Sequence, residues 1–234
     1  MTEHTTSGPD STAGSAVETG DTAAAVLAGN PTHSNEDVRK TYREQAATMA
    51  RLDPLNGLLT GRYRRRLFGT ASGRVLDVAC GVGTNERYLP EDCAYVGVDI
   101  SPDMLAKARE RLAGRRRAIT LQKMDAHDLD CPDDSFDTVI SSLSTCTFPD
   151  PLTALAEMGR VCRPDGRVLL LEHGRSSVGP IAQFQDWRAD AHFRKHHCRW
   201  NQEPLEVIER SPLAAVDHST AALGVLTAIE ARPE

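Results

Sequence analysis

The feature that most limits how this chain can fold is an alternation of short apolar runs with helical segments. One helix begins at Ser101-Pro102 and runs to about Leu112, because serine is a favoured N-cap and proline a favoured first helical residue. Short apolar runs separated by helices are typical of parallel sheets that are covered on both faces. We therefore predict an α/β fold with a doubly wound, mostly parallel sheet and helices on both faces. The five predicted strands are residues 74–79, 94–99, 118–122, 136–141 and 167–172.

The N-terminal part of the chain differs in composition from the rest. Residues 1–38 contain six acidic residues and no Lys or Arg, so they account for the whole net charge of −6. Thr, Ser, Gly and Ala dominate this stretch, and such a composition cannot bury enough apolar surface to fold. We predict a disordered acidic tail over residues 1–33, followed by a single domain over residues 34–234.

Further helices are predicted on either side of the strands. Residues 36–50 and 57–68 have helical patterns, and we expect two helices because Asp53-Pro54 interrupts the pattern. Residues 151–162 also look helical, and the RPDG sequence of residues 163–166 predicts a turn before the last of the five strands.

Composition also excludes several classes of protein. No apolar run reaches the roughly 20 residues of a membrane-spanning helix, so no transmembrane segment is expected. The six cysteines are scattered without a C-x-x-C pair, which favours free thiols and a cytoplasmic protein. Two arginine clusters, at 62–66 and 115–117, are expected at helix ends facing solvent, and no nucleic-acid partner is expected.

The sequence RVLDVACGVGTN (residues 74–85) predicts a strand that runs into a ligand-binding turn. Gly81 and Gly83 allow the backbone to approach a ligand closely. A triphosphate-binding loop would need a lysine after the last glycine, which is missing here. A dinucleotide fingerprint would need a third glycine where Glu86 stands. The ligand of this turn is therefore expected to lack a phosphate at this position.

Three acidic residues follow or end successive predicted strands and indicate which ligand the turn binds. Asp77 precedes the turn, Asp99 can accept hydrogen bonds from two ribose hydroxyls, and Asp125 can accept one from an adenine amino group. Parallel strands bring such residues to one edge of the sheet, where ligands of this architecture bind. A nucleoside with a cationic amino-acid arm fits the three acids, and that description matches S-adenosyl-L-methionine. For Asp77 and Asp99 the competing interpretation is N-capping or turn chemistry.

Five segments in order, VLDVACGVGTN, VGVDIS, MDAHDL, FDTVISS and RPDGRVLLLEH, resemble a class I S-adenosylmethionine-dependent methyltransferase over about residues 38–175. Among these enzymes the chain is similar to the quinone-biosynthesis and methyltransferase-like small-molecule branches. The resemblance implies a seven-stranded Rossmann-like sheet and transfer of a methyl group to a small molecule. Ala79 is a departure, because many members have glycine there. The implied cofactor-binding residues are Tyr42, Asp77, Ala79, Gly81, Gly83, Thr84, Asn85, Asp99, Ile100, Met104, Asp125, Ala126, Ser141 and Ser142.

Different residues of this set are expected to contact different parts of the cofactor. The loop 79–85 would lie along the methionine part and Tyr42 would close over its carboxylate, whereas Ile100 and Met104 would flank the adenine. Ser141 and Ser142 would face the sulfonium. For Tyr42 and Met104, plain helix packing is the alternative.

Substrate recognition is expected from elements that the sheet leaves free, above all an insert at residues 174–203. The insert is rich in aromatic and histidine residues, which favours an apolar or planar acceptor. His173, at the end of the fifth strand, is the candidate general base, with a structural histidine as the alternative. His192 and His196 share a helix face, so a metal site is a second interpretation, although none is predicted. The candidate substrate residues are Cys146, Phe148, Trp187, His192, His196 and Trp200.

Two other functions compete with methyl transfer. A non-catalytic S-adenosylmethionine-binding regulatory protein could share the fold, although the intact glycines and acidic residues speak against it. A nicotinamide-dependent oxidoreductase is disfavoured by Glu86. The sequence does not indicate the oligomeric state or the methylated atom.

Overall fold

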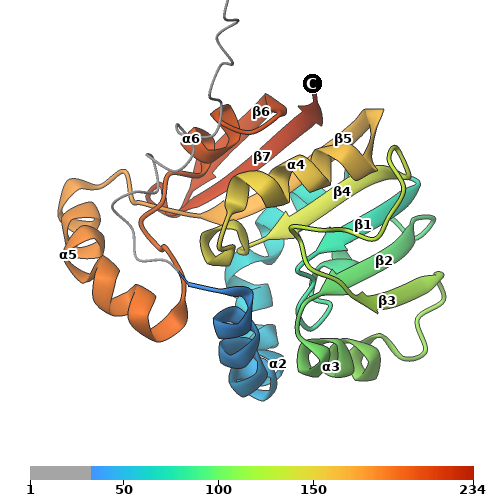
Figure 1. The fold of residues 1–234 in the computed structure, drawn as a ribbon, viewed down its shortest axis with the longest axis horizontal. Helices are drawn as coiled ribbons and strands as arrows, with labels where there is room; N and C mark the ends of the chain where they lie inside the picture. The colour runs from blue at the N-terminus through green and yellow to red at the C-terminus, as the bar shows by residue number, and fades with distance from the viewer. Residues whose placement is uncertain (1–32) are drawn as a thin grey trace, which may run out of the picture. The chain divides into compact units, whose positions relative to one another are not determined.

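A computed structural model describes residues 33–234; the predicted acidic tail, apart from His33, lies outside the described residues. A seven-stranded sheet has the strand order β3-β2-β1-β4-β5-β7-β6 (Figure 1). The first five strands pair in parallel, and β7 and β6 add antiparallel to the edge of β5. The predicted fold class is therefore confirmed. The strands are β1 (Arg74–Val78), β2 (Ala94–Asp99), β3 (Ile119–Lys123), β4 (Phe136–Ser142), β5 (Cys162–His173), β6 (Leu213–Ala221) and β7 (Leu226–Pro233).

Helices cover both faces of the sheet, because the strand side chains alternate between two apolar clusters. Val75, Leu169 and Leu171 belong to the cluster that also contains Phe68. Their neighbours along the strands belong to the other cluster, together with α4 side chains. The helices are α2 (Asn35–Phe68), α3 (Pro102–Leu112), α4 (Pro151–Val161), α5 (Gly179–His196) and α6 (Pro204–Glu209), with 3₁₀ turns η1 (Asn85–Tyr88) and η2 (Thr145–Thr147).

The strand order reverses between β1 and β4. The chain moves outward from β1 through β2 to β3 and then returns to place β4 on the other side of β1. Connections that diverge on opposite sides of a central strand leave a crevice at the carboxyl ends of β1 and β4, where ligands of doubly wound sheets bind. None of the helices in residues 33–234 has the length and apolar character needed to cross a bilayer.

Two local predictions were wrong. Residues 35–68 form one helix, not two, and Pro54 lies inside it. A proline within a helix forgoes one backbone hydrogen bond, and contacts of the neighbouring Asp53, described below, hold the helix in place there. Residues 163–166 do not form a separate turn, because β5 already begins at Cys162. On the partner strand β4, Phe136 pairs with Cys162 and Thr138 pairs with Arg167, so residues 163–166 form a bulge in β5.

The predicted start of the long helix is supported by a capping box. The Ser34 hydroxyl accepts a hydrogen bond from the Asp37 backbone N–H, and the Asp37 carboxylate accepts one from the Ser34 backbone N–H. Such reciprocal pairs satisfy two backbone donors that the first helical turn leaves free. The capping box therefore fixes where α2 begins, close to the carboxyl edge of the sheet (Figure 1).

Candidate functional site

A pocket lies at the carboxyl ends of β1, β2 and β4 and is closed on one side by α2. Its cavity volume is about 130 Å³, and the wider empty space of about 960 Å³ includes open solvent at its mouth. A pocket at this place in a doubly wound sheet is where small ligands bind. Twelve of the predicted site residues line it: Tyr42, Ala79, Gly81, Thr84, Asn85, Asp99, Ile100, Met104, Asp125, Ala126, Ser142 and Phe148.

The turn after β1 bends so that its backbone faces the pocket. Ala79 (φ +55°), Gly81 (φ +55°) and Gly83 (φ +74°) all have left-handed backbone conformations. A Cβ added at Gly81 would meet nothing within 4 Å, so this glycine faces open space. A Cβ at Gly83 would lie 2.9 Å from the Leu112 side chain, so Gly83 serves the packing of α3 and does not line the pocket. The two glycines of the motif thus have different roles.

Asp99 ends β2 with a buried carboxylate. Its two oxygens accept hydrogen bonds from the backbone N–H groups of Gly81 and Ser101, both at 2.8 Å. Burial raises the pKa of Asp99 to about 6, although these two hydrogen bonds favour the ionised form. Each oxygen keeps a lone pair, so the carboxylate can accept further hydrogen bonds from hydroxyl groups in the pocket.

A second carboxylate, Asp125, lies at the same edge of the sheet. One oxygen accepts hydrogen bonds from the backbone N–H of His127 and lies 2.6 Å from Nδ1 of the same residue. The other accepts from the Asn35 side chain at the start of α2. Because Asn35 and His127 also line the pocket, this group offers both acceptors and donors to a flat polar ligand such as a purine.

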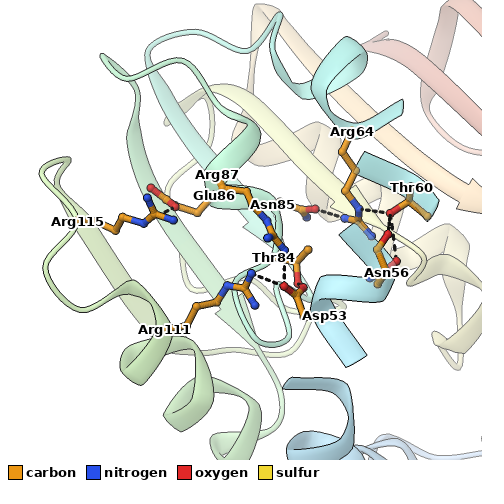
Figure 2. Close-up of polar contacts among 10 residues, drawn as sticks. All are labelled: Asp53, Asn56, Thr60, Arg64, Thr84, Asn85, Glu86, Arg87, Arg111 and Arg115. Atoms are coloured by element: carbon orange, nitrogen blue, oxygen red, sulfur yellow. Dashed lines mark hydrogen bonds and ion pairs between the residues drawn. The ribbon is translucent and has the colours of Figure 1, made fainter. Parts of the chain in front are cut away.

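A buried guanidinium faces the pocket from α2, which the sequence interpretation missed. Arg64 is only 2% exposed. Its Nη1 donates to the Ser142 hydroxyl at 2.6 Å. Nη1 also donates to the Asn85 side-chain carbonyl, and Nε donates to Thr60 at 3.0 Å (Figure 2). A buried cation beside the end of β4 is well suited to bind an anionic group of a ligand.

Asp77 positions Asn85, and through it Arg64, but does not itself line the pocket. It is fully buried, and its carboxylate accepts hydrogen bonds from the Tyr95 hydroxyl at 2.7 Å and the Asn85 amide at 2.9 Å. Burial raises the pKa of Asp77 to about 6, and the nearby charge of Arg64 acts in the opposite direction. Asn85 therefore links Asp77 to the guanidinium, and Asp77 is a positioning residue in this structure.

A second cluster fixes α2 against the glycine turn. The buried Asp53 carboxylate accepts a hydrogen bond from the Thr84 hydroxyl at 2.5 Å and pairs with Arg87 and Arg111 (Figure 2). Burial acts to raise the pKa of Asp53, but the Thr84 and Arg111 hydrogen bonds and both arginine charges hold it below its ordinary value. This cluster joins α2, η1 and α3, which explains why the helix continues through Pro54.

The arginine clusters are not simply solvent-facing, as the sequence suggested. Arg64 is buried, and Arg117 is nearly so, with its Nε 2.8 Å from the Glu86 carboxylate. Arg115 approaches the same carboxylate at 3.2 Å (Figure 2). Paired in this way, the buried Glu86 occupies the position of the third fingerprint glycine without entering the pocket.

Several predicted site residues lie outside the pocket lining. The Ser141 hydroxyl points into the sheet and donates to the Val78 carbonyl at 2.7 Å. His173, the candidate base, contacts Cys146 and Cys198 instead of the pocket. The rest belong to the insert or to its packing: Trp187 is 74% exposed, and Trp200 stacks on His192, which contacts His196. The residues that the structure does not bring to the pocket are therefore Asp77, Gly83, Ser141, Cys146, His173, Trp187, His192, His196 and Trp200.

Comparison with known proteins identifies the family. Residues 76–170 match a family described as "Methyltransferase domain". The chain is 35% identical over 154 residues to a phosphatidylethanolamine N-methyltransferase of Cereibacter sphaeroides, which covers 61% of this chain and 74% of the relative. It is 36% identical over 155 residues to a ubiquinone/menaquinone biosynthesis C-methyltransferase of Geobacter sulfurreducens, covering 60% of this chain and 59% of that protein.

Solved structures share the fold. A chain in the complex between the Haloferax volcanii Trm112 methyltransferase activator and a methyltransferase superposes with a TM-score of 0.67 at 19% identity, covering 82% of this chain and 98% of that chain. A geranyl diphosphate methyltransferase in complex with S-adenosylmethionine gives a TM-score of 0.59 at 15% identity, with coverages of 75% and 85%. The sequence relatives show, and the shared fold agrees, that this chain belongs to the class I S-adenosylmethionine-dependent methyltransferases and transfers a methyl group from S-adenosyl-L-methionine to a small-molecule acceptor.

Proposed function

We propose that S-adenosylmethionine lies across the pocket from Asp125 to Arg64. The adenine lies between Ile100 and Met104 with its edge at Asp125 and Ala126. The ribose hydroxyls donate to Asp99, and the methionine part follows the turn of residues 79–85. The observation that carries this proposal is that one pocket is lined by both a buried carboxylate, Asp99, and a buried guanidinium, Arg64.

The chemistry of the lining fits each part of this ligand. Among residues 33–234, the hydrogen-bond donors to Asp99 are two backbone N–H groups, so its remaining lone pairs suit two neighbouring hydroxyl donors. Arg64 suits the methionine carboxylate, because a guanidinium forms charge-assisted hydrogen bonds with carboxylates. Gly81 leaves the backbone of the turn open to the ligand.

When bound, S-adenosylmethionine supplies an electrophilic methyl group on sulfur. The protein's own contribution is to hold the acceptor in line with that group and to exclude water, and such positioning is worth about 7–11 kcal/mol. Ser142, Ser144 and Thr147 line the pocket near the end of β4, so a polar acceptor atom has polar neighbours there. We do not retain His173 as the base in this proposal, because its side chain faces Cys146 and Cys198.

The acceptor is proposed to be apolar or amphipathic. Besides the polar groups, the pocket is lined by Val38, Met49, Met124, Leu143 and Phe148. Met49 continues on α2 into an exposed apolar surface, the leucine face, made of Leu52, Leu55, Leu58 and Leu59. An exposed apolar patch that adjoins a pocket is typical of a binding surface for apolar ligands. The similarity to a phosphatidylethanolamine N-methyltransferase is in keeping with such an acceptor.

A transfer assay tests this choice of acceptor. Methyl-labelled S-adenosylmethionine is incubated with the protein and with phosphatidylethanolamine in phosphatidylcholine vesicles, a short-chain hydroquinone, or water-soluble phosphoethanolamine. We expect label in one of the first two acceptors. Replacing Leu55 and Leu58 by Gln should raise the KM for that acceptor and leave the affinity for S-adenosylhomocysteine unchanged. Transfer to phosphoethanolamine alone would contradict an apolar acceptor.

We also propose a cytoplasmic location and a domain boundary near residue 33. The cysteines support the location, because all six are free thiols in the structure. The boundary is supported by composition and by the capping box at Ser34, where the described helix begins.

A further inference from the structure

Three metal-binding side chains from distant parts of the sequence meet beside the pocket. Cys146 belongs to η2, His173 is the last residue of β5, and Cys198 follows α5. The two sulfur atoms are 3.4 Å apart, and Nε2 of His173 lies 3.2 Å from Cys146 Sγ and 3.4 Å from Cys198 Sγ. All three ligand atoms thus form a nearly equilateral triangle.

The size of this triangle matches the ligand shell of a zinc ion. Zinc binds thiolate sulfur at about 2.3 Å and imidazole nitrogen at about 2.0–2.1 Å in a tetrahedral arrangement, which places the ligand atoms roughly 3.4–3.8 Å from one another. The observed separations of 3.2–3.4 Å are only a few tenths of an ångström shorter than these values, and an ion slightly out of the plane of the three atoms can lie at bonding distance from all of them. Thiolate and imidazole ligands favour zinc over magnesium or calcium.

The orientation of His173 suits a metal ligand. Its Nε2 is the ring nitrogen that approaches both sulfurs. The Trp200 backbone lies close to the same ring, so Nδ1–H can donate to it and leave the Nε2 lone pair for a metal, as is usual for metal-bound histidines. Arg199 is buried next to the two cysteines.

His192, on α5, lies near Cys198, and its ring stacks on Trp200 at 4.3 Å between ring centres. Its ring nitrogens are not among the ligand atoms that lie within 4.8 Å of one another in the part of the chain that the structure describes. Three protein ligands therefore leave the fourth position of the ion to water, as in zinc sites with an open position.

A disulfide between Cys146 and Cys198 is the main alternative. The sulfur separation of 3.4 Å is well beyond the roughly 2.05 Å of an S–S bond. A disulfide also gives no reason for His173 to approach both sulfurs equally, whereas a shared metal ion does.

We infer that Cys146, His173 and Cys198 bind a zinc ion, with water in the fourth position, and that the ion fastens the segment after α5 to the carboxyl end of β5. The backbone already brings these parts together, because the Arg199 N–H donates to the Cys146 carbonyl at 2.9 Å. The ion would hold α5 and the segment after it next to η2, whose last residue Thr147 lines the pocket together with the adjacent Ser144.

Metal analysis of the full chain, purified under reducing conditions without chelators, tests this inference. We expect about one zinc ion per chain, and less than about 0.2 in Cys198→Ser and in His173→Gln, because each change removes a ligand. Cys131→Ser is the matched control, since Cys131 lies outside the cluster, and it should keep the full zinc content. His192→Gln keeps all three ligands and should retain most of the zinc.

A cobalt titration of the unaltered protein makes the test independent of any folding defect in the variants. Co²⁺ added to the zinc-free chain should give the strong near-ultraviolet absorption of thiolate–cobalt bonds and the intense visible bands of a tetrahedral site. The inference is overturned if the reduced wild-type chain holds no zinc and gives no such bands. It is equally overturned if mass spectrometry finds a Cys146–Cys198 disulfide in place of metal, or if the cluster variants bind as much zinc as Cys131→Ser.

Discussion

Replacing Arg64 with methionine tests the proposed direction of the cofactor in the pocket. The guanidinium is buried and reaches Thr60, Asn85 and Ser142, and we propose that it also binds the methionine carboxylate. A hydrogen bond to a charged group is worth about 1.5–3 kcal/mol. Arg64→Met should therefore weaken binding of S-adenosylmethionine and S-adenosylhomocysteine by about 10- to 150-fold, since 1.4 kcal/mol corresponds to a factor of ten.

The assay compares two ligands by isothermal titration calorimetry. S-adenosylhomocysteine carries the amino-acid carboxylate, whereas 5′-methylthioadenosine has the same adenosine and sulfur without it. If Arg64 binds the carboxylate, the variant should lose affinity for the first ligand and change by less than about twofold for the second, which never makes that charge-assisted bond. Arg65→Met, an exposed arginine on the same helix, is the matched control and should bind both ligands normally.

Two results would refute this reasoning. An equal loss for both ligands would show that Arg64 supports the pocket only through Asn85 and Ser142. Unchanged binding of both would show that the methionine carboxylate lies elsewhere.

The remaining predictions concern the other end of the pocket, the strained turn and the tail. Asp99→Ala should weaken S-adenosylhomocysteine by about 1.5–3 kcal/mol in calorimetry, and unchanged affinity would place the ribose elsewhere. Because burial raises the pKa of Asp99 to about 6, the carboxylate is half ionised at that pH and becomes fully ionised as the pH rises further. Affinity should therefore fall as the pH drops through that value, by about tenfold at pH 5, and a flat profile in the wild type would contradict this role. Ala79→Gly should stabilise the protein by about 0.5–1 kcal/mol in chemical denaturation, because Ala79 has φ +55° and a left-handed alanine costs about 1–2 kcal/mol. The control Ala182→Gly, inside α5, should destabilise it, and a stability loss in both would rule out strain at Ala79. Deleting residues 1–32 should leave S-adenosylhomocysteine binding and thermal stability unchanged, and a loss of either would make the tail part of the fold.

The sequence predicted the sheet well because the strands have local signatures. Runs such as RVLDV and RVLLLE are apolar on both faces, which is typical of strands buried between two helical layers. The same argument located the pocket, since parallel strands bring Asp99, Asp125 and Ser142 to one edge. The prediction from local patterns failed at Pro54, because the contacts that hold Asp53 come from the distant residues 84, 87 and 111.

The local sequence does not show which distant segments come into contact, nor which residue of a charged cluster is buried. The residues that the sequence interpretation missed depend on one or the other. Arg64 stands among exposed arginines, and composition alone does not distinguish it. A helical periodicity was available as a signal, because Gly61, Arg64 and Phe68 recur on one face and are all buried. Nothing in the sequence spacing of Cys146, His173 and Cys198 predicts that they meet, so His173 was assigned to chemistry in the pocket.

A crystal structure of the protein with S-adenosylhomocysteine tests the central claim most directly. We predict the ribose hydroxyls within about 3.2 Å of the Asp99 carboxylate and the amino-acid carboxylate within the same distance of the Arg64 guanidinium. The adenine should lie between Ile100 and Met104. A ligand bound in the reverse direction, with its adenine at Arg64, or bound outside this pocket would contradict the account.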